Sequence, residues 1–306
     1  MTSLDFRGVY PAMTTPFHDD GRIDFETLRS YATRLVDAGV DGVVPVGSTG
    51  ESATLTHDEH VEVIEAVVDE VDVPVVAGAG SNATHEAVRL SERAADAGAD
   101  ALLHISPYYN KPEQAGFREH YETVADAVDL PQVVYNVPSR TGRSLAPETV
   151  AELAEHPNVV AYKAASGDLE LVSEVVERAP EGFAVLSGDD GLTLPVCSVG
   201  GVGTVSVVAN VEPERTCALV GAALAGDYER ARRIHRRLAP LVRQLFVETN
   251  PIPVVEANRI RGYTQGNLRS PLTRLSGSRR EALATVLADL ERDRADLDDE
   301  PPEASR

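Results

Sequence analysis

Short apolar runs rich in β-branched residues alternate with longer amphipathic stretches along most of the 306-residue chain. The interval of about 25 to 30 residues is typical of βα units. Eight runs are expected to be strands: residues 9–15, 41–46, 73–79, 100–106, 131–137, 158–164, 183–188 and 202–208. Because they are nearly continuous in apolar residues, they fit parallel strands that are covered on both faces. Eight such units in series favour an α/β fold of the closed (β/α)8 TIM-barrel type. The alternative is a doubly wound open sheet, which would carry GxGxxG after its first strand, and none is there.

The stretches between these runs carry helix-end signals. Asp24 is placed to cap a helix that stops before Gly39. Thr56 and Glu59 have the spacing of a capping box at the start of another helix. A third helix is expected to open at Thr84, and the pattern repeats after Pro147 and after Asp168.

The strand pattern is lost near residue 212. Three further helices are expected over residues 227–248, 251–262 and 278–292. We therefore expect three parts: a barrel over residues 1–226, a small C-terminal helical region over 227–292, and an acidic, disordered tail over 293–306.

The charge of the chain restricts its partners and its compartment. A formal net charge of -21 and a pI near 4.7 argue against nucleic acid and anionic membranes as partners. The same acidic composition would suit a cytoplasm of high salt. Cys197 and Cys217 form no CxxC motif, and no signal peptide or long apolar run is present. We expect a soluble protein of the cytoplasm.

Lysine is almost absent from the chain, because only Lys111 and Lys163 occur. Lys163 lies in the apolar run NVVAYKAASGD, residues 158–168. Burial lowers the pKa of a lysine, and the neutral amine can attack a carbonyl to form an imine. Arginine cannot do this, since its guanidinium stays protonated in proteins. A lysine that reaches solvent from a strand end, or one paired with a buried carboxylate, is the structural alternative.

Two segments at the ends of expected strands carry polar residues. GSTGE, residues 47–51, combines two hydroxyls with glycines that let backbone N–H groups converge on an anion. YNVPSRTG, residues 135–142, places the Tyr135 phenol near Arg140, and these can relay a proton and grip a carboxylate. Carboxyl ends of parallel strands meet at one face of a barrel, so both segments are expected beside Lys163.

Other polar clusters fit structural roles better. His57 and His60 are three residues apart on an expected helix, but no third ligand is evident, so no metal is expected. The basic run 230–237 is expected to be a solvated helix face. Tyr108 and Tyr109 follow the fourth expected strand, where packing or an interface is the default.

Five motifs occur in a fixed order along the chain: GSTGE, PYYNKP, YNVPSRTG, the strand lysine and LSGDD. Over about residues 6–275 the chain therefore resembles the dihydrodipicolinate synthase and N-acetylneuraminate lyase family of pyruvate-dependent class I aldolases. GESATLTHDEH, YNVPSRTG and LFVETNPIPV look most like its synthase branch. Members of that branch are lyases that condense pyruvate with L-aspartate 4-semialdehyde in lysine and diaminopimelate biosynthesis.

The resemblance implies a set of catalytic residues. Lys163 would form the Schiff base with pyruvate, and Tyr135 would move protons during imine formation and release. Ser48 would link Tyr135 to Tyr109, which would reach in from a neighbouring subunit of a homotetramer. No cofactor is implied besides the covalent imine.

The resemblance also implies a set of binding residues. Gly47 and Thr49 would hold the pyruvate carboxylate, Arg140 the semialdehyde carboxylate, and Gly188 and Val205 would line the pyruvate pocket. In members that L-lysine inhibits, an effector site matches a second set of positions here: Ser52, Ala53, His57, His60, Asn82, Glu86 and Tyr108.

Three positions depart from the synthase pattern. The branch usually has threonine at Ser48, often has glutamate at Ala164 and frequently has lysine at Val255. A second reaction stays open on this ground, the cleavage of a 2-keto-3-deoxy sugar acid to pyruvate and a neutral aldehyde. A non-catalytic barrel that senses a keto acid or lysine is a further alternative.

Overall fold

One curled parallel sheet forms the centre of the protein, with strands in the order β1-β7-β6-β5-β4-β3-β2. The structure is a computed structural model that describes residues 4–297. Within these residues the strands are β1 (Gly8–Pro11), β2 (Val76–Gly78), β3 (Ala101–Ile105), β4 (Gln132–Asn136), β5 (Val159–Ala164), β6 (Ala184–Ser187) and β7 (Gly203–Ser206). Every strand pair is parallel, as expected for a barrel of βα units.

The second expected strand, residues 41–46, is not a regular strand, yet it closes the sheet. Val44 N–H donates to the Pro11 carbonyl at 2.9 Å, and Val43 accepts from Val76 N–H at 2.9 Å. The segment thereby joins β1 to β2 through isolated parallel bridges. Regular pairing stops because Pro45 has no N–H and Val46 adopts a φ of 49°. The fold is therefore an α/β TIM barrel, with this closing segment in the place of an eighth strand.

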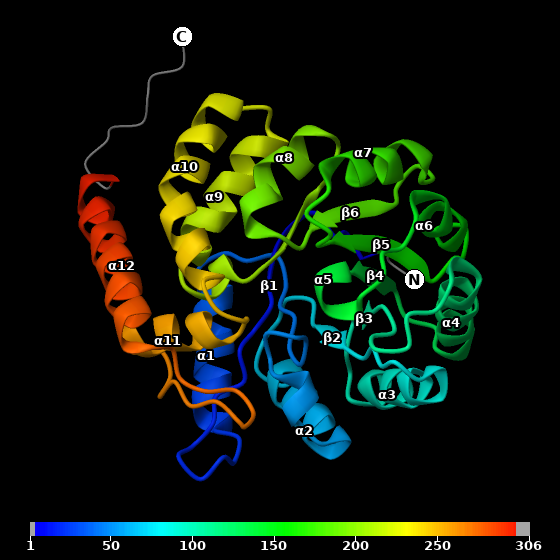
Figure 1. Ribbon diagram of the computed structural model, residues 1–306, viewed down its shortest axis with the longest axis horizontal. Helices are drawn as coiled ribbons and strands as arrows, with labels where there is room; N and C mark the ends of the chain where they lie inside the picture. The colour runs from blue at the N-terminus through cyan, green and yellow to red at the C-terminus, as the bar shows by residue number, and fades with distance from the viewer. Residues whose placement is uncertain (1–3, 298–306) are drawn as a thin grey trace.

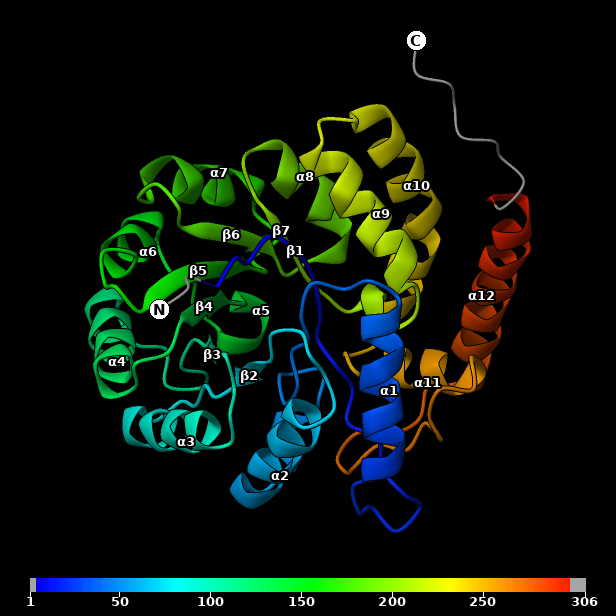
Figure 2. The ribbon, with the colours of Figure 1, turned by 180° about the vertical axis from the view of Figure 1, so that it is seen from behind.

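Helices surround the sheet, as Figures 1 and 2 show from opposite sides. Those of the barrel are α1 (Phe25–Asp37), α2 (His57–Val68), α3 (Thr84–Asp96), α4 (Gln114–Ala127), α5 (Pro138–Thr141), α6 (Pro147–Leu153), α7 (Leu169–Arg178), α8 (Thr193–Ser198) and α9 (Pro213–Leu224). Short 3-10 turns are η1 (Ser52–Thr54), η2 (Asp190–Leu192) and η3 (Val208–Asn210).

Side-chain caps confirm the helix starts expected at Asp24, Thr56 and Asp168. Asp24 accepts from Thr27 N–H at the start of α1, and both bonds of the capping box between Thr56 and Glu59 are present. Asp168 caps α7 by accepting from the N–H groups of Glu170 and Leu171. These caps satisfy N–H groups that the first turn of a helix leaves unpaired.

Three C-terminal helices lie against one side of the barrel: α10 (Tyr228–Leu245), α11 (Ile252–Ile260) and α12 (Gly277–Leu297). α10 contacts α9 on one side and α12 on the other. The division at residue 226 stays a prediction. α12 continues to Leu297, past the expected start of the tail at residue 293, and the rest of that tail lies outside the described residues. No described helix is both long and apolar enough to span a membrane.

Candidate active site

Lys163 and Tyr135 are neighbours across the β4–β5 pair, where they are directly in register. The Lys163 Nζ lies 4.0 Å from the centre of the Tyr135 ring, and both side chains are more than nine-tenths buried. Burial lowers the pKa of the Lys163 amine to about 7, because a charged ammonium is disfavoured away from water. Near neutral pH a large fraction of this amine is therefore unprotonated and nucleophilic.

A buried carboxylate, Asp190, acts on the same amine in the opposite direction. Its negative charge raises the pKa of Lys163, while the Arg140 guanidinium lowers it. Burial raises the pKa of Asp190 itself to about 6. Asp190 accepts hydrogen bonds from the Ser206 hydroxyl and from the N–H groups of Val207 and Val208, at 3.0 and 3.2 Å for the latter two. It thereby ties the loop after β6 to the end of β7.

Gly188 and Val205 occupy different places around Lys163. A Cβ built on Gly188 would lie 2.9 Å from both Cγ and Cε of Lys163, so glycine leaves the space that the lysine side chain fills. Val205 is buried on β7 in the barrel-interior cluster that also contains Tyr135. Gly188 is thus in direct contact with the amine side chain, and Val205 lies in the same interior.

The hydroxyl loop, residues 47–51, reaches Tyr135 through Ser48, whose side chain is hydrogen-bonded to the phenol. Burial raises the pKa of Tyr135, whereas the Arg140 charge and the Ser48 hydrogen bond lower it. The loop is bracketed by two left-handed residues, Val46 with φ 49° and Glu51 with φ 56°. Such backbone costs about 1 to 3 kcal/mol per residue and is retained where the surroundings fix it, often at functional sites.

Asn250 connects the hydroxyl loop to Arg140. Its side-chain Nδ2 donates to the Thr49 Oγ1 at 2.9 Å, and its backbone carbonyl accepts from the Arg140 Nη2 at 2.7 Å. Asn250 belongs to the NPIPV motif, to which the sequence alone assigned no role. The motif was a visible signal, but its partners could be known only from the fold.

One cavity of about 680 Å³ brings most of these residues together. Gly47, Ser48, Tyr135 and Arg140 line one part of it, with Asn250 beside them. Lys163 lies against the Tyr135 ring that forms part of the wall. Most of the predicted effector residues line another part of the same cavity: Ser52, Ala53, His57, His60, Glu86 and Tyr108.

The part of the cavity lined by the predicted effector residues is built from paired polar groups. His57 Nε2 lies 3.3 Å from a Glu86 carboxylate oxygen, and Ser81 donates to the same carboxylate. His60 Nε2 lies 3.0 Å from the Ser52 carbonyl. Asn82 is tied through its backbone carbonyl to the Asn110 side chain at 2.8 Å instead. No group of three potential metal ligands occurs among residues 4–297.

Glu51 is a second buried carboxyl that the sequence analysis missed, although it stands in GSTGE. It lines the cavity, and one carboxylate oxygen accepts from the Arg269 N–H at 3.0 Å. The other oxygen, Oε1, has no hydrogen-bond partner within the described part of the chain. Burial raises the pKa of Glu51 to about 7, with the Arg269 N–H, Thr54 and the Arg269 charge acting against it.

Tyr109 is not brought to the site by its own chain. Its side chain is 88% exposed, and its backbone adopts a left-handed φ of 68° in the loop after β3. Tyr108 beside it is 39% exposed and lines the cavity. Within residues 4–297 of a single chain Ser48 and Tyr109 are therefore not linked, and the expected link to a neighbouring subunit stays a prediction.

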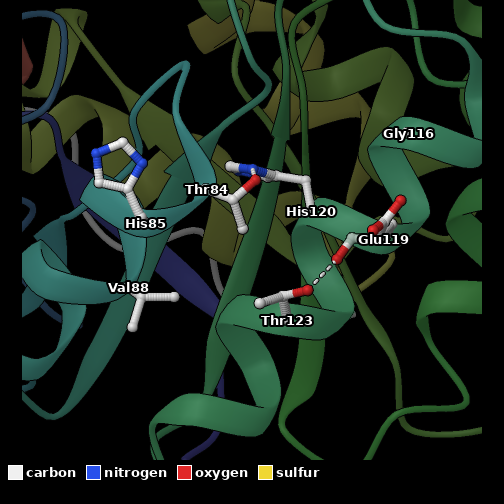
Figure 3. Close-up of a pocket in the computed structure, with 7 residues that line it drawn as sticks. All are labelled: Thr84, His85, Val88, Gly116, Glu119, His120 and Thr123. Carbon is white, nitrogen blue, oxygen red and sulfur yellow. Dashed lines mark hydrogen bonds between the residues drawn. The ribbon is translucent and has the colours of Figure 1, made fainter.

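A separate pocket of about 570 Å³ lies between α3 and α4 (Figure 3). His120 faces Thr84 there, with its Nδ1 3.0 Å from the threonine hydroxyl. Burial lowers the pKa of His120 to about 4. None of the residues predicted for the reaction lines this pocket.

Comparisons with known proteins agree with this geometry. Residues 5–290 match the model of the dihydrodipicolinate synthetase family. The 4-hydroxy-tetrahydrodipicolinate synthase of Haloarcula marismortui is 69% identical, with all of both chains covered. The structure of dihydrodipicolinate synthase from Aquifex aeolicus is similar with a TM-score of 0.92 at 45% identity, covering 94% of this chain and 98% of that one. The lysine-bound enzyme from Cyanidioschyzon merolae has a TM-score of 0.90 at 40% identity, covering 92% and 97%. With a buried strand lysine, a phenol against it and this degree of similarity over the whole barrel, the chain belongs to the dihydrodipicolinate synthetase family.

Proposed function

We propose that this protein is a 4-hydroxy-tetrahydrodipicolinate synthase, which condenses pyruvate with L-aspartate 4-semialdehyde. The observation that carries the proposal is the buried Lys163 amine, whose pKa is lowered to about 7, lying 4.0 Å from the ring centre of Tyr135. A full-length relative at 69% identity bears this name, which supports the same reaction.

The reaction begins when neutral Lys163 attacks the pyruvate ketone. The carbinolamine loses water to give an imine, and removal of a proton from the pyruvate methyl group leaves an enamine. The enamine carbon adds to the aldehyde carbon, and the resulting alkoxide takes up a proton. The amino group of the semialdehyde portion then attacks the imine carbon, releases the Lys163 amine and closes the ring.

Tyr135 is the proton carrier of these steps in our proposal. Its phenol stays protonated at neutral pH because the ordinary pKa of tyrosine is 10.0 and burial raises it further. The hydrogen bond to Ser48 gives the phenol a partner from which a proton can be taken or to which one can be passed. The chemistry proceeds through the covalent imine, so we propose that no organic cofactor or metal takes part.

The choice of aldehyde rests on Arg140. Its side chain is exposed and lines the cavity, and its one hydrogen-bond partner within residues 4–297 is the neutral Asn250 carbonyl, so its charge is available to a substrate carboxylate. A neutral aldehyde from a 2-keto-3-deoxy sugar acid would leave this guanidinium unpaired. The test is turnover by the purified protein with pyruvate and either L-aspartate 4-semialdehyde or glyceraldehyde. We expect a strong preference for the semialdehyde, and an equal or greater rate with glyceraldehyde would overturn the proposal.

We propose further that the active form is a homo-oligomer, a tetramer built from two tight dimers. Tyr109, with 88% of its side chain exposed, would complete the proton relay of a second copy through that copy's Ser48. We also propose that the protein works in the cytoplasm.

L-Lysine is the proposed inhibitor, bound at the effector part of the cavity. Glu86 and the paired imidazoles His57 and His60 supply a carboxylate and acceptors suited to amino groups. The lysine bound in the Cyanidioschyzon merolae relative supports this assignment.

A further inference from the structure

Asn250 lies between the two groups to which we assign the two substrate carboxylates. Its amide Nδ2 donates to Thr49 Oγ1 at 2.9 Å, and its backbone carbonyl accepts from Arg140 Nη2 at 2.7 Å. Thr49 and Asn250 are 201 residues apart in the sequence. A single residue of the C-terminal region therefore connects two loops at the mouth of the barrel.

The bond from Asn250 also orients the Thr49 hydroxyl. A hydroxyl has one hydrogen to donate and two lone pairs that accept. Because one lone pair accepts from Asn250, the hydrogen of the hydroxyl must point elsewhere, and it is available to the pyruvate carboxylate. The carbonyl that holds Arg140 is neutral, so the guanidinium keeps its full charge for the second carboxylate.

The remaining polar atom of the side chain is not used by the fold. Asn250 Oδ1 is buried and has no hydrogen-bond partner among residues 4–297. Asn250 itself lines the cavity next to Arg140 and Tyr135. A buried acceptor left unpaired beside a substrate cavity points to a donor that the substrate brings. The semialdehyde carries such a donor, because its amino group is attached to the same carbon as its carboxylate.

We propose that Asn250 is a positioning residue that determines aldehyde specificity, by holding Thr49 and Arg140 at a fixed separation and accepting from the substrate amino group. This inference rests on the proposed function. The first condensation product is a seven-carbon chain with a carboxylate at each end. A fixed spacing between the two carboxylate anchors favours that chain over one that ends in a neutral group.

The test measures the specificity ratio, which is kcat/KM for L-aspartate 4-semialdehyde divided by kcat/KM for glyceraldehyde. We expect Asn250→Ala to raise the KM for the semialdehyde and to lower this ratio about tenfold, the effect of losing one to two well-placed hydrogen bonds. Lys163 should still be trapped with borohydride at saturating pyruvate, which shows that the variant is folded, whereas the pyruvate concentration for half-maximal trapping should rise because the Thr49 hydroxyl loses its orienting partner.

Thr49→Val removes the acceptor of the hydrogen bond from Asn250 and nearly preserves the shape of the side chain. It should therefore lower the specificity ratio as well. In the double variant the specificity ratio should fall by less than the product of the two single-variant factors, because both substitutions remove the same hydrogen bond. Asn158→Ala is the matched control. Like the Asn250 amide, the Asn158 amide donates a hydrogen bond to a residue distant in sequence, here to the Ala125 carbonyl at 3.1 Å. Asn158 lies just before β5, at the end of this strand opposite to Ala164. Its ratio should equal that of the wild type.

An unchanged ratio in both Asn250→Ala and Thr49→Val, with a wild type that prefers the semialdehyde, overturns the inference. An equal loss of kcat/KM for both aldehydes also overturns it, because that is the signature of a purely structural residue. A wild type that captures pyruvate and ignores the semialdehyde overturns the proposed function itself, and this result is read before any variant is made.

Discussion

Replacing Gly188 by alanine should displace the reactive lysine with little other change to the barrel. The added Cβ would lie 2.9 Å from Cγ and Cε of Lys163 and 3.0 Å from the Cβ of Ala165, whereas ordinary contact begins at 3.4 Å. The lysine side chain must therefore move by about 0.5 Å, since its Cα is fixed between β4 and β6.

The expected losses follow from that displacement. Overpacking of a core costs about 1 to 3 kcal/mol of stability. A misplacement of about 1 Å can cost 100-fold in rate, so half of it should lower kcat/KM about tenfold. The yield of borohydride-trapped pyruvate at subsaturating pyruvate should fall in parallel, as measured by intact-protein mass spectrometry.

Gly221→Ala is the matched control for this experiment. Gly221 is exposed within α9, and a Cβ there would meet nothing within 4 Å. Alanine in a helix interior should raise stability by up to about 1 kcal/mol and leave activity intact. If Gly188→Ala retained wild-type trapping and kcat/KM, then the close contact with Lys163 would not control the amine, and the reasoning would be refuted.

Three further predictions concern stability, assembly and regulation. Burial lowers the pKa of His104 to about 3 and of His120 to about 4 from the ordinary 6.5, so unfolding takes up protons as the pH falls below 6.5. Stability should therefore be lost from pH 6.5 toward pH 4 by up to about 1.4 kcal/mol per pH unit for each histidine, and His120→Gln should flatten the slope, with Gln at the exposed His85 as the substitution control. Tyr109→Ala and Lys163→Arg should each be inactive alone but regain activity when co-assembled. In the mixed oligomer the Lys163→Arg copy supplies Tyr109 to a site that still contains Lys163. No recovery in proven mixed oligomers would exclude a shared site. L-Lysine at saturating pyruvate should inhibit the wild type, and Glu86→Ala should weaken inhibition about tenfold or more through loss of a charged partner, whereas a flat titration of the wild type would remove the effector site.

The barrel could be predicted because its signal is local and repeated. Apolar runs at βα spacing and capped helices such as α1 and α2 follow from neighbouring residues alone. The segment 41–46 differs because β-branched composition favoured a strand, whereas Pro45 and the left-handed Val46 interrupt the pairing. Local propensity cannot decide such a case, since the tertiary position of the segment sets its backbone.

The core of the candidate site could be predicted for a similar reason. Lys163 and Tyr135 lie on consecutive strands of a parallel sheet, so sequence order placed them side by side. Asp190, Glu51 and Asn250 were missed although each stands in a recognised motif. Their importance comes from burial and from partners distant in sequence, which a single sequence does not display.

The central claim is that Lys163 is a buried amine that is neutral near pH 7 and captures pyruvate. The chain contains its own control, because Lys111 is its only other lysine. The most direct measurement is peptide mass spectrometry after pyruvate and borohydride treatment across a series of pH values. We expect the adduct on the peptide that contains Lys163, with initial rates of trapping that rise with pH through a midpoint near 7, and none on Lys111. An adduct on Lys111 alone, or a midpoint near 10.5 as for an unperturbed lysine, would contradict the account.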